Sequence, residues 1–115
     1  MGPFRFRIQG VVREADSGRP LAGMFVQAYD KDVLFDDFLG SAHTDSEGRF
    51  EIQFTQLAFQ DVIEQRPDVY LRVFDPTGRT ELYTTIDAVR RNARVEEHFE
   101  IVIPATAMET LGSLP

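Results

Sequence analysis

Five aspartates have the clearest capacity for chemistry in this sequence. Four fall within eight residues, and the fifth follows a later apolar segment: Asp30, Asp32, Asp36, Asp37 and Asp75. Carboxylate oxygens are hard ligands, and calcium takes about six to eight of them. The five side chains meet at one edge of a sheet if the strands before them run in the same direction. The sequence therefore predicts a calcium site here, beside the simpler interpretation of a solvated loop whose aspartates cap turns.

The spacing of the acidic loop decides between kinds of calcium site. It is not an EF-hand, because Leu34 and Phe35 stand where a ligand and the obligatory glycine belong. The spacing resembles the acidic loops of C2 domains, which bind calcium and then lipid. One hypothesis is therefore a calcium-dependent module that binds lipid or carbohydrate, and that binds neither without the ion.

The phenylalanines of the same loop suggest a contact surface. Phe35 and Phe38 flank the pair of aspartates that ends with Asp37. We expect Phe38 and Leu39 to begin a strand and to face the core. Phe35 is then the more exposed ring, so Phe35 and Asp37 are the predicted contacts for a protein partner.

Two histidines are the candidates for acid–base catalysis. His43 and His98 lie 55 residues apart, and a general base needs a partner within hydrogen-bond reach. No nucleophile elbow surrounds Ser41 or Thr44. The sequence therefore predicts isolated surface histidines and no enzyme, with a small hydrolase kept as a further hypothesis.

One cluster of basic residues stands out, formed by Arg90, Arg91 and Arg94. The cluster either compensates the glutamates that follow it or receives an acidic partner, such as the 30–37 loop of another copy. A homodimer is one outcome, and the unpaired edge strands of a sandwich offer another route to it.

Charge and composition exclude several classes of partner and site. The chain has 115 residues, a net charge of −7 and no cysteine. Nucleic-acid backbones and anionic membrane surfaces are disfavoured, and there is no disulfide or zinc–thiolate site. The longest apolar runs are far too short to span a bilayer, and no signal peptide is visible. The sequence predicts a soluble chain and leaves its compartment open.

The elements that must position these residues are strands. Five segments alternate between apolar and polar residues, and two shorter strands are plausible: 4–10, 24–29, 50–54, 69–74 and 99–103, then 39–44 and 80–86. Turns that combine an aspartate with Gly18, Gly48 or Gly78 separate several of them. The pattern predicts one all-β sandwich domain of about seven strands over 1–104, a short helix within 57–66, and a C-terminal tail over 105–115.

Several short motifs resemble those of a known family. They are Gly10-Val11-Val12, Ser17-Gly18-Arg19-Pro20-Leu21-Ala22-Gly23, Val26-Gln27-Ala28-Tyr29 and Thr44-Asp45-Ser46-Glu47-Gly48-Arg49-Phe50. The region from Ile8 to Asp75 resembles the transthyretin-like and carboxypeptidase-regulatory-like sandwiches of the prealbumin type. The chain lacks the Tyr-Arg-Gly-Ser end of the related hydrolases and the cysteines of the similar nematode proteins.

The resemblance implies a transthyretin-like (Ig-like) sandwich that serves as an accessory, adhesive or docking domain. Combined with the missing catalytic constellation, it predicts a non-catalytic binding or adaptor module. Such a module recognises a protein partner through an edge strand or through the loop around 33–38.

Overall fold

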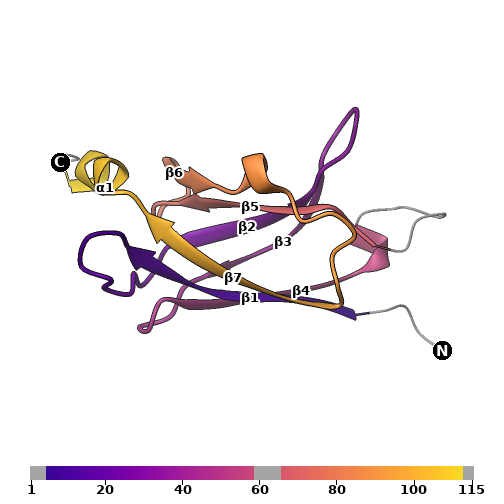
Figure 1. The fold of residues 1–115 in the computed structure, drawn as a ribbon, viewed down its shortest axis with the longest axis horizontal. Coiled ribbons are helices and arrows are strands. Elements are labelled where there is room, and N and C mark those ends of the chain that lie inside the picture. The colour runs from indigo at the N-terminus through magenta and orange to yellow at the C-terminus, as the bar shows by residue number, and fades with distance from the viewer. Residues whose placement is uncertain (1–4, 59–65, 113–115) are drawn as a thin grey trace.

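The computed structural model describes residues 5–58 and 66–112, and these form a two-layer β-sandwich (Figure 1). The strands are β1 (Arg5–Glu14), β2 (Phe25–Asp30), β3 (Asp37–His43), β4 (Arg49–Thr55), β5 (Val69–Phe74), β6 (Glu81–Thr84) and β7 (Glu96–Ile103). Three short helices join or follow them: the 3₁₀ turns η1 (Gln56–Ala58) and η2 (Ile86–Ala88), and α1 (Ala105–Gly112). The predicted all-β sandwich is confirmed.

The two sheets differ in how their strands run. One sheet has the order β4-β1-β7, and β1 pairs antiparallel with β4 but parallel with β7. The other has the order β3-β2-β5-β6, and all of its pairs are antiparallel. The neighbouring strands β2 and β5 therefore end at opposite ends of the sandwich, and this determines which loops lie close together.

The core lies between the sheets and follows the alternation of the sequence. On β4, Phe50, Ile52 and Phe54 point inward and are at most 7% exposed, whereas the residues between them face water. Val26 and Ala28 of β2 meet them from the opposite sheet and are fully buried. Period-two burial of this kind fixes the register, because a slip by one residue would turn the apolar face to solvent.

The turns follow the predicted aspartate–glycine chemistry. Asp45 accepts hydrogen bonds from the backbone N–H groups of Glu47 and Arg49, each at 2.9 Å. Gly48 closes the same turn with φ of +75°. A Cβ there would stand 2.6 Å from the carbonyl oxygen of Val12, so any other residue would strain the turn and clash.

The helices are where the sequence-based expectations differ most from the structure. Most of the helix predicted within 57–66 falls on residues 59–65, outside the described residues. The segment expected to be a tail contains α1, and its Ala107 and Met108 pack against the core. The helix was missed because eight residues are too few for a clear helical period, so packing against the sandwich stabilises it. No described helix has the length and apolar character needed to cross a membrane.

Candidate functional site

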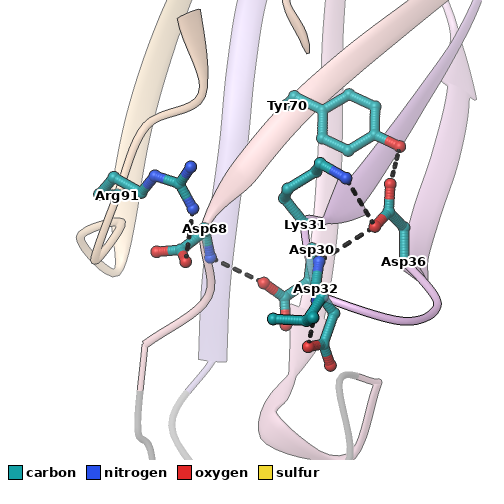
Figure 2. Close-up of polar contacts among 8 residues, drawn as sticks. Asp30, Lys31, Asp32, Asp36, Asp68, Tyr70 and Arg91 are labelled. Carbon is teal, nitrogen blue, oxygen red and sulfur yellow. Dashed lines mark hydrogen bonds and ion pairs between the residues drawn. The ribbon is translucent and has the colours of Figure 1, made fainter.

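Three segments meet at the edge of the sandwich where β2 ends (Figure 2). They are the end of β2 with its following loop, the start of β5, and the loop before β7. Antiparallel pairing places Asp30 opposite Val69, so the end of β2 lies beside the start of β5. Val69 also forms a bridge with Arg90, which brings the third segment to the same place.

Asp68 links these three segments. Its backbone N–H donates to Asp30 Oδ1 at 2.8 Å, and its carbonyl oxygen accepts from the N–H of Lys31 at 2.8 Å. Its carboxylate accepts from the N–H of Asn92 at 2.9 Å and forms an ion pair with Arg91 at 3.1 Å. One residue therefore fixes loops that are far apart in the sequence.

Asp30 has an unusual proton affinity. Partial burial is the main cause that raises its pKa to about 6, and the nearby carboxylates of Asp68, Asp37 and Asp32 add to this effect. The hydrogen bond from the N–H of Asp68 opposes the shift without cancelling it. A carboxyl group that exchanges its proton near neutral pH inside a hollow is a candidate functional group.

Asp36 and Tyr70 form the second polar pair of the site (Figure 2). Tyr70 donates its hydroxyl proton to Asp36 Oδ2 at 2.5 Å, and the N–H of Asp32 donates to Asp36 Oδ1 at 3.0 Å. The bond from Asp32, followed by that from Tyr70, lowers the pKa of Asp36. Burial and then the Asp36 carboxylate raise the pKa of Tyr70, so its hydroxyl stays a donor.

Asp30 and Asp68 line a small polar pocket of about 320 Å³. Its lining carries three acidic and three basic side chains and one amide: Asp30, Asp32, Asp68, Lys31, Arg66, Arg91 and Asn92. We call it the Asp30–Arg91 pocket. Its volume is at the small end of the range for ligand sites, which are usually more apolar, so it suits a small compound with several hydrogen-bonding groups.

The structure brings together four of the five predicted calcium ligands but not the fifth. Asp30 and Asp37 are register partners on β2 and β3, and Asp32 and Asp36 lie in the loop between them. Asp75 lies at the opposite edge, because β5 runs antiparallel to β2 and pairs Phe74 with Phe25. Its inclusion in the site is therefore wrong.

The described contacts of the aspartates give no support to the predicted calcium site. Asp75 accepts from the N–H groups of Arg79 and Thr80 within its own turn. Within residues 5–58 and 66–112, no three His, Cys, Asp or Glu side chains form a group suited to a metal ion. Calcium binding by the loop stays a prediction, without a preformed cluster to support it.

The loop between β2 and β3 projects from the sandwich (Figure 1). Its Phe35 is 82% exposed, as expected for a contact residue. Phe38 is half exposed and packs edge-on against Tyr29 on the outer face, whereas Leu39 is buried. The prediction that Phe38 faces the core is therefore wrong, because β3 points Leu39 inward and Phe38 outward.

The histidines lie on separate sheets of the sandwich. His43 is exposed at the end of β3 beside the ring of Phe25, and His98 is exposed on β7 within 2.9 Å of Glu100. Phe99, the neighbour of His98, points into the core, so His98 points out of the other layer. Both histidines lie on the surface as expected, but His98 is not isolated, because Glu100 is within hydrogen-bond distance of it.

Two of the three arginine side chains of the cluster bind other residues of the same chain. Arg90 donates to Glu97 at 2.9 Å and to the carbonyl oxygen of His98 at 2.6 Å, and its guanidinium lies over the ring of Phe99. Arg91 is paired with Asp68. Only Arg94 keeps its side chain exposed without an ion pair to another described residue.

Several site residues were absent from the sequence-based prediction, among them Asp68 and Tyr70. Tyr70 carried a weak signal, because a hydroxyl on an otherwise apolar strand needs a partner when it is buried. Asp68 carried no signal of its own, since its role depends on which loops the strand register brings together.

Comparison with known proteins gives neighbours in structure alone. No family model matches the chain, and no curated protein matches it. The sandwich resembles a 9R-lipoxygenase from Cyanothece PCC8801, with a TM-score of 0.61 and 24% identity over 88% of this chain and 16% of the lipoxygenase. The likeness to known families of transthyretin type is not tested by these findings and stays a prediction.

Two further neighbours are dioxygenases. The dioxygenase domain of a dioxygenase–carbohydrate-binding protein fusion from Streptomyces sp. SirexAA-E has a TM-score of 0.54 and 16% identity, covering 90% of this chain and 81% of the domain. Chlorocatechol 1,2-dioxygenase from Pseudomonas putida has a TM-score of 0.50 and 16% identity, covering 89% of this chain and 61% of the enzyme. At these identities the likeness shows the fold.

These neighbours correct the predicted class of function. The sequence favoured a non-catalytic adaptor, with a calcium-dependent lipid or carbohydrate module and a hydrolase as alternatives. All three neighbours are named for oxygenase chemistry. At 24% identity or less, these likenesses show a sandwich fold that oxygenases share, and the adaptor prediction is withdrawn.

The likeness to oxygenases raises the question of whether this chain could hold iron. Non-haem iron in oxygenases is commonly held by two histidines and a carboxylate on one side of the metal. His43 and His98 are on outward faces of different sheets, with the core between them. The described residues of this chain therefore do not fit such a centre.

Proposed function

We propose that this chain is a β-sandwich domain of a dioxygenase system that binds a small phenolic compound in the Asp30–Arg91 pocket. The iron that activates oxygen is then held by a protein partner or by another part of a longer chain. The observation that carries the proposal is a carboxyl group of pKa about 6 and a guanidinium that line one small pocket of an oxygenase-type sandwich.

The chemistry of the pocket supports a phenolic ligand. An ionised Asp30 accepts a hydrogen bond from a phenolic hydroxyl, and Arg91 is a donor for a second oxygen. The compound that a neighbour's name prints, chlorocatechol, carries two adjacent oxygens of this kind. Asp30 accepts such a bond best when ionised, so the proposal implies binding that tightens as the pH rises through about 6.

The first experiment is an NMR titration of the amide groups with catechol. We expect shifts at Asp30, Lys31, Asp68 and Asn92, and we expect Asp30→Asn to weaken binding about tenfold through loss of a charged acceptor. Asp16→Asn, in an exposed turn at the opposite edge, is the matched control and should bind as the unmodified chain does. The proposal would be wrong if the amide signals that shift belonged to residues outside the pocket, or if both variants bound catechol equally.

The second experiment tests where the iron is held. The purified chain is loaded with iron, its bound metal is measured, and oxygen uptake is followed with catechol. We expect no stoichiometric iron and no oxygen uptake, because the histidines cannot share an ion. Bound iron and oxygen uptake that are both lost in His43→Ala would overturn this part of the proposal.

A further inference from the structure

The tip of the loop between β2 and β3 is unusually apolar for an exposed segment. Val33, Leu34 and Phe35 are consecutive, and their exposed fractions are 94%, 82% and 82%. We call these three residues the apolar tip. A run of exposed apolar side chains on a projecting loop is costly in water and typically marks a contact surface.

An acidic collar surrounds the apolar tip. Asp32 precedes it, Asp36 and Asp37 follow it, and Lys31 offsets part of the charge through its ion pair with Asp36 at 3.5 Å. A surface that buries the tip must therefore offer an apolar floor and positive charge around its rim. The collar and the net charge of −7 also disfavour an anionic bilayer as the occupant.

A second hollow of this chain has those two properties. It has a volume of about 610 Å³ and lies at the start of β1 and just before β7. Phe6 and Val95 line it, Val95 is 44% exposed, and three arginines border it: Arg5, Arg7 and Arg94. We call it the basic hollow.

Two of these arginines have charge to offer a partner. Arg7 is already paired with Glu96 at 2.6 Å, and Glu96 lines the same hollow. Among the described residues, neither Arg5 nor Arg94 has an ion-pair partner for its side chain. The hollow therefore keeps a positive rim in a chain that is acidic as a whole.

The loop between β2 and β3, which carries the apolar tip, lies at the same end of the sandwich as the start of β1 (Figure 1), and the residues at the start of β1 line the basic hollow. We propose that two copies of this chain associate end to end, with the tip of each copy in the basic hollow of the other. A two-fold axis beyond this end makes both contacts at once, so the assembly closes at a dimer. Opposite charges at the contact guide two copies that otherwise repel each other.

The test is the mass of the full chain in solution, measured by sedimentation over a range of concentrations. We expect a monomer–dimer equilibrium. Phe35→Ser removes the largest anchor and should raise the dissociation constant about thirtyfold, and Arg94→Glu reverses the rim charge and should raise it about tenfold. Val102→Ser and Arg49→Glu change an exposed apolar and an exposed basic residue toward the opposite end of the sandwich, and they should leave it unchanged.

A mixing experiment separates specific docking from a tip that sticks to any surface. Phe35→Ser keeps its basic hollow, and Arg94→Glu keeps its apolar tip. At a protein concentration well below the dissociation constant of either variant, each variant alone should be monomeric, whereas an equal mixture should form a mixed dimer through the one remaining tip-and-hollow contact. Circular dichroism of each variant confirms that it is folded.

Three results would overturn the inference. The unmodified chain could sediment as a monomer at every concentration, or Phe35→Ser could dimerise as strongly as the unmodified chain. Vesicles of neutral phosphatidylcholine could instead capture the monomer in a way that depends on Phe35. In that last case a membrane, and not a second copy, occupies the tip.

Discussion

The two ends of the sandwich use aspartate in opposite ways. At the turn end, formed by residues 44–48 and 75–80, Asp45 and Asp75 accept bonds from backbone groups at most five residues away. At the loop end, formed by 30–37, 68–70 and 90–92, Asp30 and Asp36 accept bonds from residues that are 38 and 34 positions away, and Asp36 also accepts a local bond from the N–H of Asp32. The same side chain closes a turn at one end and joins distant segments at the other.

The pKa of Asp30 is raised, in contrast to the turn-end aspartates, whereas the pKa of Asp36 is lowered as theirs are. At the turn end, the N–H of Arg49 lowers the pKa of Asp45. Burial raises the pKa of Asp75, but the N–H of Thr80 and other local donors outweigh it, so the net shift is downward. At the loop end, burial leaves Asp30 with a pKa of about 6. Local turns thus hold their carboxylates ionised, whereas the meeting of distant segments creates a group that responds to neutral pH.

The largest expected change in the free energy of unfolding concerns Thr44, a turn-end residue whose hydrogen bonds, unlike those of Asp45 and Asp75, reach residues 20 and 23 positions away. Thr44 is buried there, donates to the carbonyl oxygen of Leu21 at 2.6 Å and accepts from the N–H of Met24 at 2.9 Å. Thr44→Val leaves both groups buried without a partner, so we expect a loss of about 3 kcal/mol in the free energy of unfolding. Urea denaturation measures it.

The matched control for this variant is Thr55→Val, whose hydroxyl serves only an exposed N–H at 3.3 Å. It should change the free energy of unfolding by less than about 0.5 kcal/mol. Equal losses for the two variants would mean that long-range bonds at the turn end carry no special weight.

The next effect concerns the two stacked tyrosines of the loop end. Tyr70 donates to the ionised Asp36, whereas Tyr29 donates to the neutral amide oxygen of Gln27 at 2.8 Å. Bonds to charged groups contribute more, so Tyr70→Phe should cost about 2 kcal/mol and Tyr29→Phe about 0.5 kcal/mol. Tyr70→Phe should also raise the pKa of Asp36, which carbon-detected NMR follows. An unchanged Asp36 titration would break the proposed link across the loop end.

The smallest expected effect concerns Asp30, whose replacement should raise the free energy of unfolding instead of lowering it. Folded Asp30 keeps its proton to a pH of about 6, whereas the unfolded group loses it near 3.8, so the folded state binds more protons between these values. The free energy of unfolding therefore falls as the pH rises through this window, by about 1 kcal/mol once solvent screening of a partly exposed group is allowed for.

Asp30→Asn removes that penalty. At neutral pH its free energy of unfolding should exceed that of the unmodified chain by about 1 kcal/mol, and its dependence on pH between about 4 and 6 should be flatter. Urea denaturation across this range checks both. A steeper fall in the variant would show that the pH response belongs to another group.

The strands and the turns were predictable from the sequence. Alternation along 50–54 places the same residues inward that the structure buries, and aspartate followed by glycine marks the turns that the chain makes. Along 69–74 alternation identifies Val69, Leu71 and Val73, whereas the structure also buries Tyr70 and Phe74. These features depend on neighbours in the sequence. The helix over 105–112 was missed because its stabilisation comes from packing and not from its own eight residues.

The loop end was only half predictable. The aspartates between 30 and 37 stood out by their number, but their partners Asp68 and Tyr70 were not identified. Whether Asp75 or Asp68 lies beside Asp30 depends on the relative direction of β2 and β5, which alternation does not encode. No sequence motif indicated the structural likeness to oxygenases, since identity to each of the three neighbours is 24% or less.

The parallel pairing of β1 with β7 has a consequence for synthesis. Arg7 pairs with Glu96, 89 residues later, and β1 lies in the middle of its sheet. A ribosome adding about 5–20 residues per second needs roughly 4–20 seconds to make that intervening chain. During this time one side of β1 has no strand to bond with, and an open edge invites pairing with other nascent chains. Arg5, Arg7 and Arg13 place positive charge along that strand, and charge on an unpaired edge discourages such pairing until the last strand emerges.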